Sequence, residues 1–143
     1  MKGNIMRPQI ALLLCALPAL PLQAATCGVD MAAVESRIAD LEQNYSLVLS
    51  DIGCDVNTIP ARQMMCDSAE TPHTDLWRMG RLDDLAWVYA IENATGQQVD
   101  LENPPRDADF IVNRDACTDE TCLCSMLIEH TNGSLGGSSP YPQ

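Results

Sequence analysis

The chain has 143 residues, with 20 acidic and eight basic side chains and a formal net charge of −12 at pH 7. This length predicts a single domain. Nucleic acids and anionic membrane surfaces would repel so acidic a chain, so the charge argues against both as partners. It favours a basic protein or a cation as partner, or it serves only to keep the protein soluble.

Residues 1–24 have the pattern of an export signal. Lys2 and Arg7 give a positive start, "IALLLCALPALPL" forms an apolar core, and "QAAT" provides small residues for cleavage near Ala24 or Ala25. The core is too short to span a bilayer, and no second apolar run of about 18 residues follows. We therefore predict a periplasmic or secreted bacterial protein whose mature chain does not insert into a membrane.

Cleavage would also remove Cys15 and leave six arginines against 20 acidic residues, a formal charge of −14. Six cysteines would remain, and an even number in an exported chain is typical of a disulfide framework. The residues before Cys27 match the usual lipidation signal poorly, so a lipid anchor is not expected there. Aromatic residues are few, and each disulfide would add about 2–4 kcal/mol to a core made mainly of aliphatic side chains.

The pattern of apolar residues predicts an all-α domain of about four helices over residues 25–135. The first helix is predicted over residues 30–50, where apolar side chains recur every three or four positions and Asp30 is the cap. Residues 51–71 predict a loop followed by a short helical piece. The second long helix is predicted over residues 74–95 by a similar apolar stripe.

Residues 96–105 contain Gly, Asn and a pair of prolines, and therefore predict a loop. A third helix should begin after this loop, with Ala108, Ile111 and Val112 pointing inward, and should end close to Cys117. No stretch of the chain alternates apolar and polar residues for long enough to predict a strand.

A fourth helix is predicted over residues 120–130. Thr118 or Asp119 is its expected cap, and acidic residues occupy its first turn. The segment that follows is rich in Gly, Ser and Pro, so we predict a flexible tail at residues 136–143.

Three cysteines, Cys117, Cys122 and Cys124, fall within eight residues. A zinc site would combine them with His130 or His73. Their spacing differs from the paired cysteines of common zinc sites, and export favours oxidised thiols. A redox C-x-x-C motif is absent. We therefore expect no metal and no other cofactor.

Disulfides account for this spacing better than a metal does. A bond between Cys117 and Cys122 would join the end of the third helix to the first turn of the fourth, because the intervening cap breaks the helix. Cys124 faces a different direction on the fourth helix and needs a distant partner. One of the many connectivities that six cysteines allow has three pairs: Cys27–Cys124, Cys54–Cys66 and Cys117–Cys122. Only the last of these pairs rests on geometry.

Several spaced motifs follow one another between Cys54 and Leu135. Two cysteines stand about a dozen residues apart, and a helix with Leu82-Asp83 and Tyr89 comes next. The most specific motif is Arg114-x-x-Cys117-x₄-Cys122-Leu123. In these features the chain resembles the LprI-like lysozyme-inhibitor family of small, exported, helical bacterial domains.

The chain departs from the family pattern at three positions. Phe110, Leu127 and His130 stand where the family has Trp, Tyr and Arg. The first helix, with Cys27 and Cys124, lies outside the pattern and looks like an added helix with its own disulfide. The resemblance implies a small disulfide-bonded helical domain that inhibits lysozyme in the periplasm.

Arg114 lies at the centre of the most specific motif. It can bind an acidic group of a partner, or it can anchor the third helix through Asp83 or Asp84. The second interpretation is favoured, because every arginine of this chain has acidic residues at hand. Asp83 and Asp84 are neighbours on a helix and point about 100° apart, so they do not form a converging catalytic pair.

The acidic corner formed by Asp115, Asp119 and Glu120, beside Arg114 and a rigid disulfide, is the predicted binding site for a basic protein. The alternative is that these acids only solvate the start of a helix. Trp77 and Trp87 are on different sides of the second helix, so one is expected in the core and the other at an interface.

The sequence therefore predicts an exported, acidic protein-binding module, with a lysozyme as the partner implied by the family resemblance. The alternatives are an immunity protein that neutralises a secreted toxin and an envelope protein with a structural or stress role. An enzyme is not expected, because no motif combines a nucleophile, a base and an orienting group.

Overall fold

The computed structural model describes residues 26–55, 58–67 and 75–143, and these residues form an all-helical domain without strands, as predicted. Within these ranges, no helix is both long enough and apolar enough to cross a bilayer. The predicted export signal, residues 1–24, lies outside the described part of the chain. The elements are η1 (Thr26–Gly28), α1 (Met31–Tyr45), α2 (Pro60–Asp67), α3 (Asp75–Thr95), α4 (Ala108–Asp115), α5 (Glu120–Leu135) and η2 (Gly136–Ser138).

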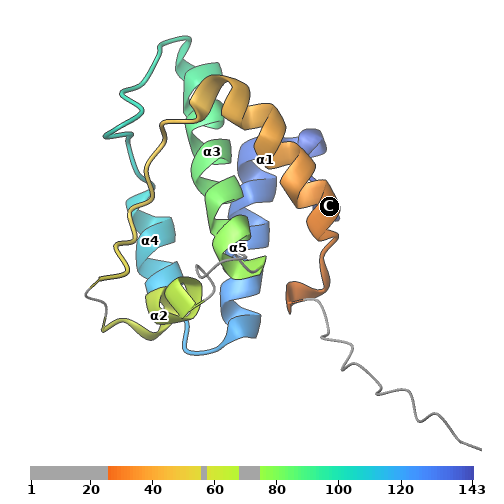
Figure 1. The fold of residues 1–143 in the computed structure, drawn as a ribbon. Helices are drawn as coiled ribbons and strands as arrows, with labels where there is room; N and C mark the ends of the chain where they lie inside the picture. Colours follow the sequence, from red (N-terminus) through yellow and green to blue (C-terminus); the bar gives the residue numbers. More distant parts are fainter. Residues whose placement is uncertain (1–25, 56–57, 68–74) are drawn as a thin grey trace, which may run out of the picture.

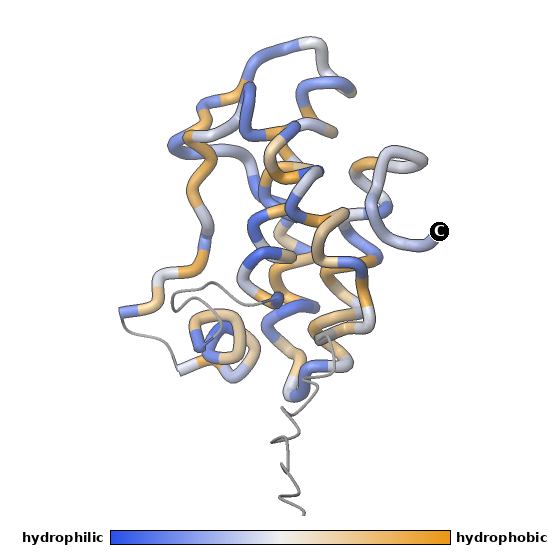
Figure 2. Tube along the Cα trace, turned by 45° about the vertical axis from the view of Figure 1, so that its right-hand side comes forward, coloured by the Kyte–Doolittle hydropathy of each residue, from blue (hydrophilic) through white to orange (hydrophobic). Residues whose placement is uncertain are grey.

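Helix α3 is the centre of the domain, and its two main packing partners are α1 and α5 (Figure 1). Apolar residues spaced along most of its length are buried: Leu76, Met79, Leu82, Leu85, Ala86 and Val88. Orange and blue segments alternate along the helices in Figure 2, as expected for helices that bury one side. The core is therefore aliphatic, in agreement with the composition.

Helix α1 begins at the predicted cap but ends earlier than predicted. The Asp30 carboxylate accepts hydrogen bonds from the backbone N–H groups of Ala32 and Ala33 at 3.0 and 3.3 Å. The helix stops at Tyr45, and the prediction that it continues to residue 50 is wrong. The Arg81 side chain binds the carbonyl oxygens of Ser46 and Val48, and these contacts hold the chain in a non-helical course.

Helix α2 corresponds to the predicted short helical piece. Pro60 is its first residue, a position where the missing N–H group of proline costs no helical hydrogen bond. Its buried residues are Ala61 and Met65. The terminal methyl group of Met65 occupies the space where a side chain at Gly80 would lie, so glycine lets α2 approach α3 closely.

Helix α4 has the predicted position, but its inward side was predicted incorrectly. Ala108 is exposed, and 67% of Val112 is exposed, whereas Ile111 is half-buried. Arg114 is instead the buried residue of this helix, and Phe110 packs against the core. The apolar residues predicted the wrong inward side because a buried arginine with carboxylate partners occupies that side of the helix.

Helix α5 starts at the predicted cap, Asp119, and runs beyond the predicted end at residue 130 to Leu135. Residues 136–143 were predicted to form a flexible tail, whereas the structure folds them back onto the body of the domain. Tyr141 is only 3% exposed, and the Asn132 side chain donates a hydrogen bond to the Pro142 carbonyl oxygen at 2.9 Å. Burial of this aromatic ring explains why a Gly- and Ser-rich segment is ordered.

Three disulfides connect distant parts of the chain, and they are the pairs named from the sequence: Cys27–Cys124, Cys54–Cys66 and Cys117–Cys122. The first joins the segment before α1 to α5 across a sequence separation of 97 residues. Lipid attachment through a thioether would require the Cys27 sulfur atom, which here is bonded to Cys124.

Candidate functional site

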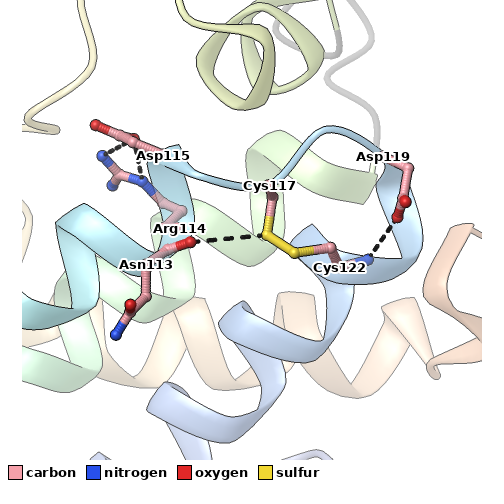
Figure 3. Close-up of a disulfide and its surroundings, with 6 residues drawn as sticks. All are labelled: Asn113, Arg114, Asp115, Cys117, Asp119 and Cys122. Carbon is pink, nitrogen blue, oxygen red and sulfur yellow. Dashed lines mark hydrogen bonds and ion pairs between the residues drawn. A yellow bond between two sulfur atoms is a disulfide. The ribbon is translucent and has the colours of Figure 1, made fainter.

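The predicted corner between α4 and α5 is held by a disulfide and a helix cap (Figure 3). Cys117 follows the end of α4, and Cys122 lies in the first turn of α5. The Asp119 carboxylate accepts a hydrogen bond from the backbone N–H of Cys122 at 2.8 Å. The corner is therefore rigid, as the sequence indicated.

The four residues predicted to bind a partner do not form one cluster. In Figure 3, Arg114 and Asp115 lie on one side of the disulfide and Asp119 lies on the other. The Asp115 side chain is only 16% exposed, and Arg62 and Arg114 bind it at 2.7 and 3.0 Å. Asp119 and Glu120 are exposed. The corner thus presents two acidic side chains to solvent, and Asp115 belongs to an internal network.

Arg114 is a structural anchor, but its predicted partners were wrong. The guanidinium donates hydrogen bonds to both carboxylate oxygens of Asp51, at 2.9 and 2.8 Å, instead of to Asp83 or Asp84. Burial lowers the pKa of Arg114, but the Asp51 and Asp115 carboxylates outweigh this effect and raise it. Burial raises the pKa of Asp51, but the Arg114 contact lowers it below its usual value.

A second polar cluster, centred on His130, joins three helices in the core. Asp83 on α3 is 4% exposed, and it contacts His130 Nδ1 at 2.8 Å and accepts a hydrogen bond from the Thr131 hydroxyl at 3.0 Å. The other ring nitrogen, Nε2, lies 3.4 Å from Asp107, the cap of α4. The imidazole ring stacks on Phe110, with 3.8 Å between the ring centres.

The sequence offered Asp83 only as a possible partner of Arg114, and its contact with His130 was missed. The two residues are 47 positions apart, and no local pattern connects them. A buried acid within an apolar helical stripe was the one available signal, because such a carboxylate needs a partner.

Three ionisable groups of this region, Asp83, Asp84 and His130, hold their protons more tightly in the folded protein than in the unfolded chain. Burial, followed by the Asp83 carboxylate, raises the pKa of Asp84 to about 7. Burial lowers the pKa of His130, but Asp83 and then Asp107 outweigh this effect and raise it. Burial also raises the pKa of Asp83, although His130 and Thr131 act against it.

We expect the free energy of unfolding to fall by about 2–3 kcal/mol as the pH rises from about 5 to 8. A group with a raised folded pKa stabilises the protein below its unfolded pKa, and this contribution is lost as the pH rises through the folded pKa. For Asp84 the loss extends from about pH 4 to the folded value of about 7. For His130 it begins near its unfolded pKa of about 6.5.

Urea unfolding at a series of pH values would measure this dependence. His130→Gln should flatten the curve above about pH 6.5, and Asp84→Asn should flatten it between about pH 4 and 7. If the free energy of unfolding of the unmodified protein increases from pH 5 to 8, the raised pKa values of Asp84 and His130 are wrong. Below about pH 4 the trend should reverse, because the pKa values of Asp51 and Asp107 are lowered.

The charges of the described residues are distributed unevenly between the interior and the surface. All six arginines form ion pairs within the domain: Arg37, Arg62, Arg78, Arg81, Arg106 and Arg114. The exposed acids of the described ranges that have no ion-pair partner there are Asp30, Asp55, Asp67, Asp100, Glu102, Asp109, Asp119, Glu120 and Glu129. The surface therefore keeps an excess of negative charge that the domain itself does not neutralise.

The described cysteines and acids do not form a metal centre. All six cysteines are in disulfides, and no group of three or more His, Cys, Asp or Glu side chains in the described ranges is placed to hold a metal ion. His73, considered above as a zinc ligand, lies outside those ranges.

Comparisons of the chain with protein-family models, with curated proteins and with solved structures found no match.

Proposed function

We propose that the protein is an exported, acidic protein-binding module whose partner is a basic protein, and that this partner is a lysozyme. The observation that carries the proposal is that the positive charges of the domain are paired internally, whereas many of its negative charges are not. Every described arginine forms an ion pair inside the domain, while nine exposed acids have no ion-pair partner among the described residues. A positively charged surface is the natural complement of this arrangement.

Long-range attraction would make binding fast and sensitive to salt. The chain after the predicted signal has a formal charge of −14, whereas animal-type lysozymes are basic and cut their substrate with a pair of carboxylates in a cleft. Opposite net charges raise the association rate, and added salt screens this attraction. A rigid inhibitor then needs only a small surface that blocks the cleft.

The choice of lysozyme rests on the resemblance to the LprI-like family, and two departures from the family pattern lie next to each other in the folded structure. Phe110 stands where the LprI-like family has Trp, and His130 stands where it has Arg. The two side chains stack on each other, and Asp83, which the family pattern includes, bonds to His130. A Trp and an Arg at these two positions would also be able to stack, because an arginine is attracted to the face of an aromatic ring.

The first experiment measures cell-wall lysis by several basic lysozymes, with and without the oxidised mature protein, at low and moderate salt. We expect dose-dependent inhibition that weakens as salt is added. A variant with Glu102→Gln, Asp109→Asn, Glu120→Gln and Glu129→Gln removes four exposed charges without touching an ion pair. It should lower the association rate by about tenfold at low salt and leave the dissociation rate nearly unchanged.

The matched control carries Glu102→Asp, Asp109→Glu, Glu120→Asp and Glu129→Asp, which changes the same four exposed positions but keeps all four charges. It should leave the association rate almost unchanged. If none of several basic lysozymes is inhibited or bound, the lysozyme proposal is wrong, and an immunity role against a secreted toxin or a structural role in the envelope becomes the better hypothesis.

A further inference from the structure

Two hollows lie side by side on the face formed by α1, α3 and the segment after α1. The larger has a volume of about 430 Å³, and the smaller has a volume of about 140 Å³. Trp77 and Arg81 line both hollows, so the two form one continuous surface, which we call the Trp77 face.

The larger hollow is lined by both apolar and charged side chains. Four positions of α1 line it at the spacing of one helix side: Glu35, Ile38, Ala39 and Glu42. The two glutamate side chains, 51% and 40% exposed, reach across to Arg78 and Arg81 on α3. Both ion pairs are made through Oε1, and a carboxylate can accept hydrogen bonds from more than one donor, so each glutamate can also bind a cation of a partner.

The smaller hollow is mainly apolar, although Arg81 and Asp84 also line it. Val48, Leu49, Met65, Trp77 and Gly80 contribute to its lining. Its volume of about 140 Å³ is close to that of an apolar cavity of about 150 Å³, which admits a benzene ring. It is therefore large enough for one large apolar or aromatic side chain of a partner.

The wall between the hollows is held in place before any partner arrives. Arg81 donates hydrogen bonds to the Glu42 carboxylate and to the Ser46 carbonyl oxygen, both at 3.0 Å, and it also binds the Val48 carbonyl oxygen. A surface that is already ordered loses little conformational entropy on binding.

Exposed apolar side chains gather beside the smaller hollow. The large apolar residues with more than half of their surface exposed in the described ranges are Leu47, Leu49 and Val112, at 60%, 56% and 67%. Two of the three lie on the segment that borders this hollow, and Leu49 lines it. Apolar side chains beside a pocket are typical of a protein interface.

We propose that the Trp77 face is the docking surface for the basic partner, which inserts one aromatic or large apolar side chain into the smaller hollow and places flanking Lys or Arg side chains on Glu35 and Glu42. This inference rests on the proposed function, since the acidic surface is what selects a basic partner. The α4–α5 corner is a weaker site, because its exposed acids, Asp119 and Glu120, line neither hollow and so have no pocket beside them for an apolar side chain of the partner.

The test uses two pairs of matched variants at exposed positions. Ala39→Arg places a long cationic side chain in the larger hollow, and Ala94→Arg makes the same change at an exposed position of α3 outside both hollows. Leu49→Ser removes an apolar side chain from the rim of the smaller hollow, and Val112→Ser removes a similarly exposed side chain on α4. None of the four changes a buried residue.

The probes are an animal-type lysozyme and a capped peptide, Lys-Lys-Phe-Lys-Lys, compared with the analogue in which Ala replaces Phe. Two-dimensional NMR of the labelled protein should show peptide-induced shifts at Ala39, Leu49 and the Trp77 indole. Ala39→Arg and Leu49→Ser should each weaken binding of both probes by about tenfold, and the two controls should leave it within about twofold.

The outcomes separate this inference from the proposed function. If Ala39→Arg and Leu49→Ser do not affect lysozyme binding, the Trp77 face is not the docking surface, but the lysozyme proposal still stands. Peptide binding at the face without any lysozyme binding would support the face and remove lysozyme as the partner. If the peptide causes no shifts at Ala39, Leu49 and Trp77, or causes shifts only at the α4–α5 corner, the Trp77 face is not the docking surface.

Discussion

Replacing Arg114 with methionine is expected to lower the free energy of unfolding by about 3–5 kcal/mol, because it leaves buried carboxylates without their partner. Arg114 is 3% exposed and forms a two-bond contact with Asp51 and a further ion pair with Asp115. Asp51 and Asp115 are 15% and 16% exposed, so water cannot replace the guanidinium effectively. Among the described residues, Arg62 would be their one remaining ion-pair partner.

Chemical unfolding of the oxidised protein would measure this loss, with Arg78→Met as the matched control. Arg78 also pairs with one glutamate, but the two side chains are 32% and 51% exposed, so its removal should cost less than about 1 kcal/mol. Arg114→Lys should recover only part of the stability, because an ammonium group cannot reproduce the planar two-bond contact. Equal costs for Arg114→Met and Arg78→Met would show that the buried network contributes little.

Local chemistry predicted the starts of the helices and the corner between α4 and α5. Asp30 and Asp119 were recognised as caps because a short carboxylate before an amphipathic segment satisfies free N–H groups. The Cys117–Cys122 bond followed from the cap between the two cysteines. These features depend on residues within a few positions of one another, which a sequence displays directly.

Features that depend on distant contacts were not predictable in the same way. Helix α1 ends at Tyr45 because Arg81, more than 30 residues later, binds the carbonyl oxygens that follow it. Asp51 is the partner of Arg114 across a separation of 63 residues, and it lies in a loop without any recognisable motif. In both cases a tertiary ion pair or hydrogen bond overrides the local pattern.

At the candidate site, too, the sequence indicated what neighbouring residues determine and missed what distant contacts determine. Asp115, Asp119 and Glu120 were grouped because they are close in sequence, but the fold directs Asp115 inward to two arginines. The Trp77 face combines α1, α3 and the segment after α1, so no single stretch of sequence contains it. A tryptophan at an interface was expected on general grounds, but the fold was needed to show what surrounds it.

Removing the Cys27–Cys124 disulfide by replacing both residues with alanine is expected to cost about 4 kcal/mol of stability. The bond closes a loop with a sequence separation of 97 residues, so it restricts the unfolded chain strongly. The same change at Cys117 and Cys122, separated by five residues, should cost about 2 kcal/mol. Chemical unfolding of the two double variants and the unmodified protein would measure the difference.

The two disulfides should also differ in their effect on binding. Cys27 lies just before α1, and α1 supplies Ile38 and Ala39 to the Trp77 face, whereas Cys117–Cys122 lies at a corner that does not line it. Loss of the first bond should therefore weaken peptide binding, because α1 is then held mainly by its packing on α3 through Val34 and Leu41. If removal of Cys117–Cys122 proves the more damaging to both stability and binding, the long-range bond is not what holds α1 in place.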